Sequence, residues 1–522
     1  MRLHILKKLL ISFVFIVCFC GCTIKIANYA EFEKYSDPTG KSNIRLPVIL
    51  VPGIKGSVLE RNGETLWGKS YRVMFLWKYD ELQFKLKPQL GQNFEENFSA
   101  EYKEMNMKTE IMEDYRIDIF GLNLFKISIY HKIRDFLMKT GGYSIDTDLF
   151  LFSYDWRLDN RISAVLLAKK VINVQKDYKA FLKKALGESV FNKKWDELKV
   201  KGLVVNDQIK VNIIAHSMGG LVSRYYLQIL GGSKYVKKLI LFGTPNLGAA
   251  DSMKALAEGE YPESIFHFYH KVRTRPIIFS WPSVYQLLPR YSGSLKNKDE
   301  VILSAEKLNN WGLSTTEMNT ENLENAYNNW KNYNLIPKSL GEDNWIIKTF
   351  LREQLDDALK FHCAINGKIN KSYEENKLKS IQVFLNKTGQ NNENLISDLK
   401  NNTISKITEN DKSKSNQNKI SIIIFGGYCE PTTKTAKISN GNHIEFDTLK
   451  DKKSFRVIVP MGDGRVPVES LAPKDEEKVG DFQFMICEDH IGLVTNDTFQ
   501  YNLLHELLGP TNFINQEKEL KE

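Results

Sequence analysis

Residues 211–220 read Val211-Asn212-Ile213-Ile214-Ala215-His216-Ser217-Met218-Gly219-Gly220. The apolar, β-branched first half predicts a buried strand, and residues 218–228 then predict a helix. Ser217 lies where the strand becomes the helix, in Ala-x-Ser-x-Gly, a variant of the Gly-x-Ser-x-Gly nucleophile elbow. We therefore expect the Ser217 hydroxyl to stand above the edge of a sheet. An ordinary strand-to-helix turn with a serine N-cap is the alternative.

Further strands and helices alternate along the chain on both sides of this turn. Alternation of this kind predicts a mostly parallel sheet flanked by crossover helices, and with the elbow it indicates an α/β-hydrolase fold. The expected strands are 44–51, 148–153, 237–242, 420–425, 455–459 and 482–486, and the expected helices include 127–139 and 163–186.

The changes in composition predict how the 522 residues are divided. Residues 251–365 are rich in helix formers and aromatic residues, show no clear strand, and suggest a helical cap inserted into the hydrolase core. Residues 366–419 are dominated by Asn, Lys, Ser, Glu and Thr, so part of this insert is expected to be disordered. The expected units are a signal (1–22), a tether (23–43), a first core part (44–250, with a lid segment at about 60–115), the cap, the insert, a second core part (420–510) and a polar tail (511–522).

The first 22 residues predict export. Basic residues precede an apolar run that is too short to span a bilayer comfortably, and the run ends at Phe19-Cys20-Gly21-Cys22. This ending resembles a bacterial lipoprotein cleavage box with Cys22 as the lipidated residue, although Phe19 is unusual there. A plain signal or an uncleaved anchor remains the alternative. The protein is therefore expected to be secreted or attached to a membrane surface, and not cytoplasmic.

Charge and cysteine content exclude several classes of protein. The net charge of +9 arises from 72 basic and 63 acidic residues, which is too mild and dispersed for a nucleic-acid partner. Three of the six cysteines lie in the signal, which leaves Cys363, Cys429 and Cys487. This remainder predicts neither a zinc site nor a full disulfide framework, and one bridge is possible without an assignment. We expect no metal site and no cofactor.

The strand that ends at Val51 leads into Pro52-Gly53-Ile54-Lys55-Gly56-Ser57. In the hydrolase fold this turn supplies the second oxyanion donor, so the backbone N–H groups of Ile54 and Met218 are the expected oxyanion hole. A simple strand-to-loop turn is the alternative.

A nucleophilic serine needs an imidazole and a carboxylate, and in this fold they follow the serine in the order acid, then histidine. Elimination leaves two late histidines. His505 lies on an amphipathic helix, where histidines are usually structural, whereas His490 lies in a loop that follows a strand. Asp463 stands in a Gly-flanked turn at the end of a strand, with Glu469 and Asp489 as reserves. The predicted triad is Ser217, Asp463 and His490.

Aromatic residues gather at 64–79, where Trp67 is followed by Tyr71, Phe75, Trp77 and Tyr79 among basic residues. Such a segment suits a lid or an interfacial surface, and buried aromatics in a cap would show the same pattern.

With these pieces in order, the sequence resembles the lecithin:cholesterol acyltransferase family, which includes lysosomal phospholipase A2 and phospholipid:diacylglycerol acyltransferase. The serine elbow and Gly243-Thr244-Pro245-Asn246-Leu247-Gly248 occur in many lipases, whereas Tyr154-Asp155-Trp156-Arg157-Leu158 is far more specific. The other matching motifs are 48–60 and Gly462-Asp463-Gly464-Arg465-Val466-Pro467. The resemblance implies the triad and oxyanion roles given above.

The chain also departs from the family pattern. It lacks cysteines for the small disulfide loop of animal members, Ala215 replaces the more general glycine, and only Ile119-Phe120-Gly121 represents their Pro-Gly-Phe-Gly segment. We predict Trp67, Phe120 and Trp156 as substrate contacts.

The sequence thus predicts a serine acylhydrolase or O-acyltransferase that acts on glycerolipid esters, most of all phospholipids, at a membrane surface. A triacylglycerol lipase or a deacylase of lipid-linked glycans is one alternative. An inactive, surface-anchored binding protein is the other.

Overall fold

The computed structural model describes residues 44–68, 79–86, 102–112, 114–119, 122–128, 130–259, 267–297, 300–301, 309, 311–313, 318–341, 344–390, 420–439, 443–449, 462–473 and 479–508. The predicted signal with Cys22, the tether, Phe120, the strand at 455–459 and the polar tail lie outside these residues, as does most of the aromatic segment at 64–79. Within the described part, no helix combines the length and the apolar character that crossing a membrane requires.

A six-stranded sheet forms the centre, in the order β17-β14-β11-β10-β1-β7, and every neighbouring pair is parallel. This confirms the α/β-hydrolase architecture. Because β1 lies between β7 and β10, the strand order reverses at β1, and the carboxyl ends of strands at such a switch point form a crevice for ligands. The strands are β1 (Val48–Val51), β7 (Leu149–Leu151), β10 (Val211–His216), β11 (Val236–Phe242), β14 (Ser421–Gly427) and β17 (Phe482–Ile486).

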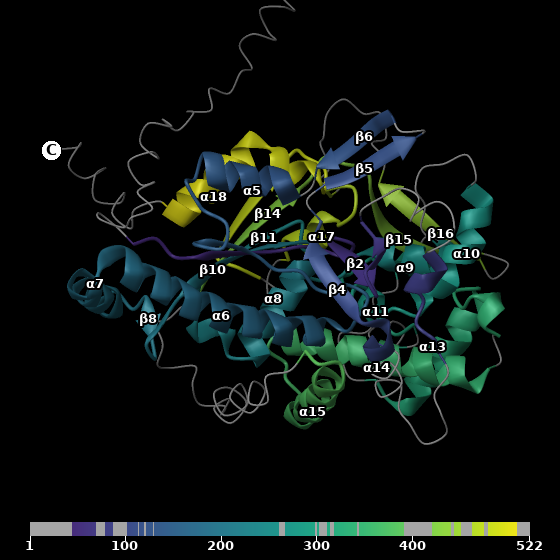
Figure 1. Cartoon of the computed structure of the whole chain (residues 1–522). Coiled ribbons are helices and arrows are strands. Elements are labelled where there is room, and N and C mark those ends of the chain that lie inside the picture. The colour runs from purple at the N-terminus through teal and green to yellow at the C-terminus, as the bar shows by residue number, and fades with distance from the viewer. Residues whose placement is uncertain are drawn as a thin grey trace, which may run out of the picture.

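Helices cover both faces of this sheet (Figure 1). Alternate residues of β1 point to opposite sides, so that Ile49 and Val51 join one core while Val48 and Leu50 join the other. The first core lies against α6 and α8, and the second against α5 and α18. The helices are α5 (Tyr130–Lys139), α6 (Asn160–Leu186), α7 (Glu188–Val200), α8 (Met218–Ile229), α9 (Ala250–Glu258), α10 (His267–Phe279), α11 (Pro282–Tyr285), α13 (Thr320–Asn332), α14 (Trp345–Ile365), α15 (Lys371–Lys387), α17 (Val468–Leu471) and α18 (Asp497–Leu508).

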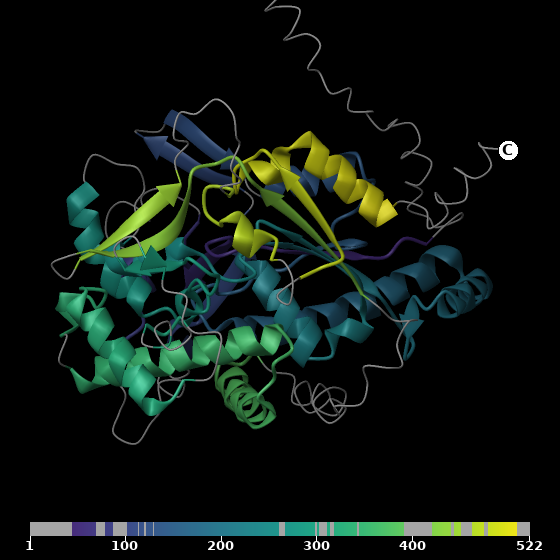
Figure 2. The same cartoon turned by 180° about the vertical axis from the view of Figure 1, so that it is seen from behind.

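The region predicted as a helical cap also contributes strands, which the sequence did not indicate. β12 (Leu295–Asn297) pairs with β13 (Glu300–Val301) and, in parallel, with β15 (Thr432–Ser439), which pairs with β16 (His443–Leu449). A strand of three residues is too short to show a recognisable alternation of polar and apolar residues. The cap and the second core part are therefore joined by a shared sheet, seen beside α10 in Figure 2.

Two further segments have defined structure where the sequence was ambiguous. The first part of the Asn/Lys-rich insert forms α15, which buries Leu378, Ile381, Phe384 and Leu385, while residues 391–419 lie outside the described part. The segment predicted as a lid contains an antiparallel sheet in the order β3-β2-β4, and its role as a lid stays a prediction. Its elements are β2 (Ser57–Arg61), β3 (Glu64–Trp67), a short helix (Tyr79–Leu82) and β4 (Met107–Ile111). Two hairpins complete the described strands. They are β5 (Asp114–Ile119) with β6 (Leu122–Ser128), and β8 (Val204–Val205) with β9 (Gln208–Ile209).

A disulfide joins Cys429 to Cys487, with their Cα atoms 5.1 Å apart. Cys429 follows β14, and Cys487 directly follows the neighbouring strand β17. Next to Cys429, the Glu430 N–H donates to the Gly462 carbonyl at 3.0 Å. The bridge thus ties the end of β14, which lies beside the Asp463 turn, to the end of β17, which leads into the His490 loop.

Replacing both Cys429 and Cys487 by serine is expected to lower the free energy of unfolding by about 4 kcal/mol. The reason is that a bridge across a loop of this length restricts the unfolded chain. Urea unfolding with and without reductant measures the effect, and Cys363→Ser is the matched control because Cys363 is not part of this disulfide. A reductant that shifts the wild type no more than it shifts the double variant would contradict the expectation.

Candidate active site

Ser217 occupies a sharp turn between β10 and α8. Its backbone is left-handed, with φ 50° and ψ −127°, and its N–H donates to the Phe242 carbonyl on β11 at 2.9 Å. Although Ser217 takes the N-cap position of α8, its hydroxyl makes no capping hydrogen bond. The structure therefore has the strained elbow geometry and not the ordinary N-cap alternative.

Small residues make this turn possible. A Cβ atom on Gly219 would lie 2.3 Å from the Pro52 carbonyl oxygen, and one on Gly220 would lie 2.1 Å from the Thr244 hydroxyl oxygen. Contacts so short do not occur between real atoms, so any larger residue would push α8 away from the strand ends. The sequence motif thus fixes how closely the helix approaches the sheet.

His490 and Asp463 lie in direct contact. The Nδ1 atom of His490 is 2.7 Å from Asp463 Oδ2, and the backbone N–H of His490 donates to the Asp463 carbonyl, also at 2.7 Å. The other carboxylate oxygen accepts the backbone N–H groups of Arg465 at 3.0 Å and Val466 at 2.7 Å. Asp463 is fully buried, so its carboxylate is held in one orientation and fixes the imidazole with Nδ1 protonated.

The His490 imidazole lies over the end of β11, the strand whose last residue, Phe242, accepts the hydrogen bond from the Ser217 N–H. A Cβ atom on Gly243, the residue after Phe242, would lie 3.0 Å from both Nδ1 and Cε1 of His490. No hydrogen bond between the Ser217 hydroxyl and His490 occurs among the described residues. In unliganded enzymes the contact between nucleophile and base is often long and tightens only when substrate binds.

The turn after β1 lies against Ser217. A Cβ atom on Gly53 would lie 2.7 Å from the Ser217 Cβ and 3.3 Å from its Oγ. The turn is closed by a 3.0 Å hydrogen bond from the Gly56 N–H to the Gly53 carbonyl. Within the described part of the chain, the N–H groups of Ile54 and Met218 donate to no acceptor. Both remain available to a developing oxyanion.

A chain of hydrogen bonds, missed by the sequence reasoning, links this turn to the histidine loop. The Gly53 N–H donates to the Tyr130 hydroxyl oxygen at 2.8 Å, and that hydroxyl is 2.8 Å from His216 Nδ1. The opposite nitrogen of His216 lies 3.2 Å from the His490 carbonyl, which can only accept. His216 therefore donates from Nε2 and accepts from Tyr130 at Nδ1.

The charge state of this chain supports that assignment. Burial, and after it the nearby His490, hold the pKa of His216 well below its usual range, so the ring is neutral. Burial also raises the pKa of Tyr130, which keeps its proton. A histidine directly before the serine was the available signal, but its partner Tyr130 lies 86 residues earlier.

Replacing Tyr130 by phenylalanine is expected to lower kcat roughly tenfold and to leave KM nearly unchanged, because the histidine loop loses its anchor at about 1–3 kcal/mol per orphaned buried group. Steady-state hydrolysis of a phospholipid measures the split. Tyr143→Phe is the matched control, since the buried Tyr143 hydroxyl has no hydrogen-bond partner in the described part of the chain. Equal losses of kcat in the two variants would show that the hydrogen bonds from Tyr130 through His216 do not position His490.

Trp67 and Trp156 each donate a hydrogen bond to the turn that follows β1. The Trp67 indole N–H donates to the Lys55 carbonyl at 3.0 Å, and the Trp156 indole N–H donates to the Ser57 carbonyl at 3.1 Å. The two rings meet edge to face with centroids 5.6 Å apart, and both are buried. Their predicted contact with substrate stays a prediction, while their contact with the turn is a structural finding.

Lys55 follows Ile54 with a left-handed backbone, φ 61°, and its ammonium lies 5.4 Å from the Trp67 ring centroid. Burial, and then the positive charge of Arg465, lower the pKa of Lys55 to about 7. A lysine whose pKa lies near neutrality therefore directly follows Ile54 in the chain, with its ammonium over the Trp67 ring.

Lys55→Met is expected to raise the free energy of unfolding at pH 7 and to flatten its rise with pH. Between pH 7 and the ordinary lysine pKa of about 10.4, the unfolded chain holds the Lys55 proton and the folded chain does not, so wild-type stability increases with pH. Urea unfolding at several pH values measures this slope. Lys139→Met, at an exposed position of α5, is the control. Unchanged slopes in both variants would contradict the expectation.

The reserve residues of the sequence prediction have other partners. Glu469 forms an ion pair with Lys434, and Asp489 accepts the backbone N–H groups of Ile491 and Gly492, both at 2.8 Å. The His505 side chain is 60% exposed on α18. Among the described residues, no group of three or more His, Cys, Asp or Glu side chains is arranged to hold a metal ion.

Comparisons with known proteins place this geometry in context. The model of the family "Lecithin:cholesterol acyltransferase" matches residues 115–473, which include Ser217 and Asp463 and end before His490. Phospholipase A(1) LCAT3 of Arabidopsis thaliana is 26% identical over 367 residues, covering 63% of this chain and 74% of that protein. Lecithin-cholesterol acyltransferase-like 4 of the same plant is 25% identical over 346 residues, covering 61% of this chain and about half (55%) of that protein.

Among solved structures, a chain of "The crystal structure of Tle4-Tli4 complex" aligns over 89% of this chain and 98% of its own length. Its sequence identity is 12% and its TM-score is 0.46.

Proposed function

Since the chain belongs to the lecithin:cholesterol acyltransferase family and is an acyl hydrolase or acyltransferase, we propose that it cleaves phospholipid esters with Ser217, His490 and Asp463 through an acyl-enzyme. The observation that carries this proposal is the buried Asp463–His490 pair beside the strained Ser217 turn. The similarity to the relative named phospholipase A(1) LCAT3 supports the choice of substrate.

The first half of the reaction forms the acyl-enzyme. His490 Nε2 takes the Ser217 hydroxyl proton while Oγ attacks the ester carbonyl carbon. The carbonyl oxygen becomes an oxyanion that accepts hydrogen bonds from the N–H groups of Ile54 and Met218, each worth about 3 kcal/mol. When the C–O bond to the lipid breaks, His490 returns the proton to the leaving alkoxide, which departs as lysophospholipid. Asp463 stabilises the imidazolium throughout.

The second half transfers the acyl chain. Water, or an alcohol in a transferase reaction, gives its proton to His490 and attacks the acyl carbon. The tetrahedral intermediate collapses to free fatty acid or a new ester, and Ser217 regains its proton.

We also propose that the protein is exported and works at a membrane surface, with Cys22 as the lipid attachment point. The Cys429–Cys487 disulfide supports export, because such bridges persist in oxidising compartments and are rare in the cytosol of mesophiles.

Lipid-product analysis tests the substrate assignment. The purified protein is incubated with phosphatidylcholine vesicles, with and without a long-chain alcohol, and in parallel with a triacylglycerol emulsion. We expect fatty acid and lysophospholipid from the vesicles, and an additional alkyl ester if the alcohol is an acceptor. Products from triacylglycerol alone would overturn the phospholipid assignment, and no product from either lipid would overturn the proposed reaction.

A further inference from the structure

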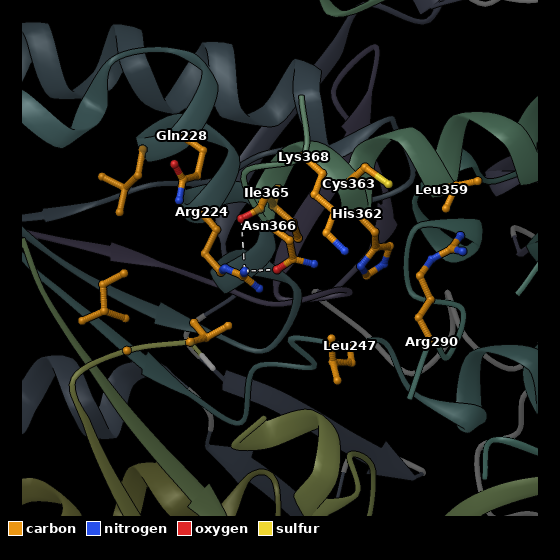
Figure 3. Close-up of a pocket in the computed structure, with 14 residues that line it drawn as sticks. Arg224, Gln228, Leu247, Arg290, Leu359, His362, Cys363, Ile365, Asn366 and Lys368 are labelled. Atoms are coloured by element: carbon orange, nitrogen blue, oxygen red, sulfur yellow. Dashed lines mark hydrogen bonds between the residues drawn. The ribbon is translucent and has the colours of Figure 1, made fainter. Parts of the chain in front are cut away.

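A second pocket lies between α8, α14 and the β14–β17 side of the sheet. Its volume is about 200 Å³, several times the ~30 Å³ that one water molecule occupies in the liquid. None of Ser217, Asp463 and His490 lines it, and Arg224 lies about two turns along α8 from Ser217. Figure 3 shows its polar side, which is formed by Arg224, Arg290, His362, Asn366 and Lys368.

Arg224 brings a buried positive charge to this pocket. It is 5% exposed, and its guanidinium donates to the side-chain oxygens of Asn246 at 3.1 Å and Asn366 at 2.6 Å, and to the Ile365 carbonyl at 3.1 Å. All these acceptors are neutral, and no carboxylate pairs with Arg224 among the described residues. Burial lowers the pKa of Arg224 to about 10. An arginine stays charged even so, and its charge favours an anion nearby.

Arg161, on the neighbouring helix α6, shows the usual solution for a buried arginine. It pairs with Asp357 at 2.9 Å and Glu374 at 3.1 Å. Burial alone lowers the pKa of Arg161, but these carboxylates raise it well above the ordinary value. The same protein thus neutralises one buried arginine with its own acids and leaves the positive charge of Arg224 facing neutral groups.

Two more cations border the pocket. Arg290 is 4% exposed, and burial lowers its pKa to about 10. Lys368 is exposed at the rim. Because Arg224 holds the Oδ1 atom of Asn366, the Nδ2 amino group of that side chain is turned toward Lys368 and His362 (Figure 3). The pocket therefore offers N–H donors as well as positive charge.

His362 adds one acceptor. Its Nε2 atom lies 2.8 Å from the Gln286 carbonyl and must donate to it, so Nδ1 carries the lone pair of a neutral ring. Burial, followed by the charges of Arg290 and Arg224, holds the pKa of His362 well below its usual range. His362 is 2% exposed, and its buried Nδ1 atom has no hydrogen-bond partner among the described residues. A ligand that satisfies this site must supply both negative oxygens and one hydroxyl donor.

We propose that this pocket binds a hydrogen phosphate group, either as the free anion or as the singly protonated monoanion of a phosphate monoester. The negative oxygens accept from Lys368, Arg290 and the Asn366 amino group. The remaining P–O–H hydroxyl donates to His362 Nδ1. Sulfate has the same shape and charge but carries no proton near neutral pH, so it cannot make the last contact.

Calorimetric titration of the full protein tests the proposal with inorganic phosphate, glycerol 3-phosphate and sulfate at equal ionic strength near pH 7. Asn366→Asp keeps the acceptor for Arg224 and replaces the amino donor with a negative oxygen. Lys368→Gln removes one rim charge, and Lys371→Gln, an exposed lysine outside the pocket lining, is its matched control.

We expect phosphate, its monoester or both to bind the wild type at least about tenfold more tightly than sulfate, which is about 1.4 kcal/mol. Binding of glycerol 3-phosphate without inorganic phosphate identifies a monoester as the ligand. Asn366→Asp and Lys368→Gln should weaken binding by about tenfold or more, and Lys371→Gln should not. Equal binding of sulfate, unchanged binding in both pocket variants, or no binding of either phosphate overturns the proposal. Phospholipid hydrolysis is measured alongside, and we expect it to be the same in Lys368→Gln as in the wild type.

Discussion

Ser217→Ala is expected to lower kcat for phospholipid hydrolysis by about a millionfold, the loss seen when the nucleophile of a serine hydrolase triad is removed. The reason is that every covalent step passes through the Ser217 oxygen, whereas the oxyanion donors alone give only weak catalysis. Release of fatty acid from phosphatidylcholine vesicles, compared with background, measures the effect.

The fold should survive this change, because the Ser217 hydroxyl makes no capping hydrogen bond to α8. Thermal unfolding of the variant checks this point. Ser223→Ala is the matched control: its hydroxyl donates to the Gly219 carbonyl at 2.8 Å within the same helix and lies outside the catalytic groups. Activity within tenfold of the wild type in Ser217→Ala would contradict the assignment of the nucleophile.

Asp463→Asn is expected to lower kcat by about 10⁴-fold, as the equivalent change does in a serine protease. The amide places an N–H group opposite His490 Nδ1, which lies 2.7 Å from Asp463 Oδ2 in the wild type. Nδ1 must then become the acceptor, so the proton moves to Nε2 and the imidazole cannot deprotonate Ser217. The pH profile of kcat for phospholipid hydrolysis measures the loss, which should be smaller at high pH where hydroxide replaces the base.

Asp489→Asn is the matched control, because Asp489 is the residue before His490 and, among the described residues, accepts only local backbone N–H groups. We expect it to keep at least about a tenth of the wild-type kcat. An Asp489 variant as inactive as the Asp463 variant would reassign the acid.

The parts of the site that the sequence predicted are those with local or ordered signals. Adjacent residues in the sequence determine the elbow, because Ser217 needs a strand before it and small residues after it. Asp463 and His490 could be chosen because the fold imposes the order of acid and base along the chain, and both follow segments whose sequence predicts a strand. The structure brings these two residues into contact.

Contacts between distant segments were not accessible from the sequence. Tyr130 and His216 meet only because α5 packs on the face of the sheet opposite α8. The sequence around neither residue predicts this contact. The Cys429–Cys487 bridge could not be chosen from three remaining cysteines. The basic pocket has the same origin, since Arg224 and His362 lie on separate helices.

Composition did not reveal two sets of elements. The Asn/Lys-rich insert begins with α15, whose apolar positions 378, 381, 384 and 385 are spaced for one helix face but are diluted by polar residues. The strands of the cap are too short for periodicity to detect. In both places, packing against the remainder of the protein provides the stability that local propensity lacks.

Peptide mapping after reaction with a fluorophosphonate is the most direct measurement of the central claim, because the reagent forms a covalent adduct only with an activated serine. The wild type is expected to carry one adduct on Ser217, and both Ser217→Ala and Asp463→Asn should show no such adduct under the same conditions. An adduct on a different residue, or fatty-acid release by a protein whose Ser217 stays unmodified by the reagent, would contradict the proposed chemistry.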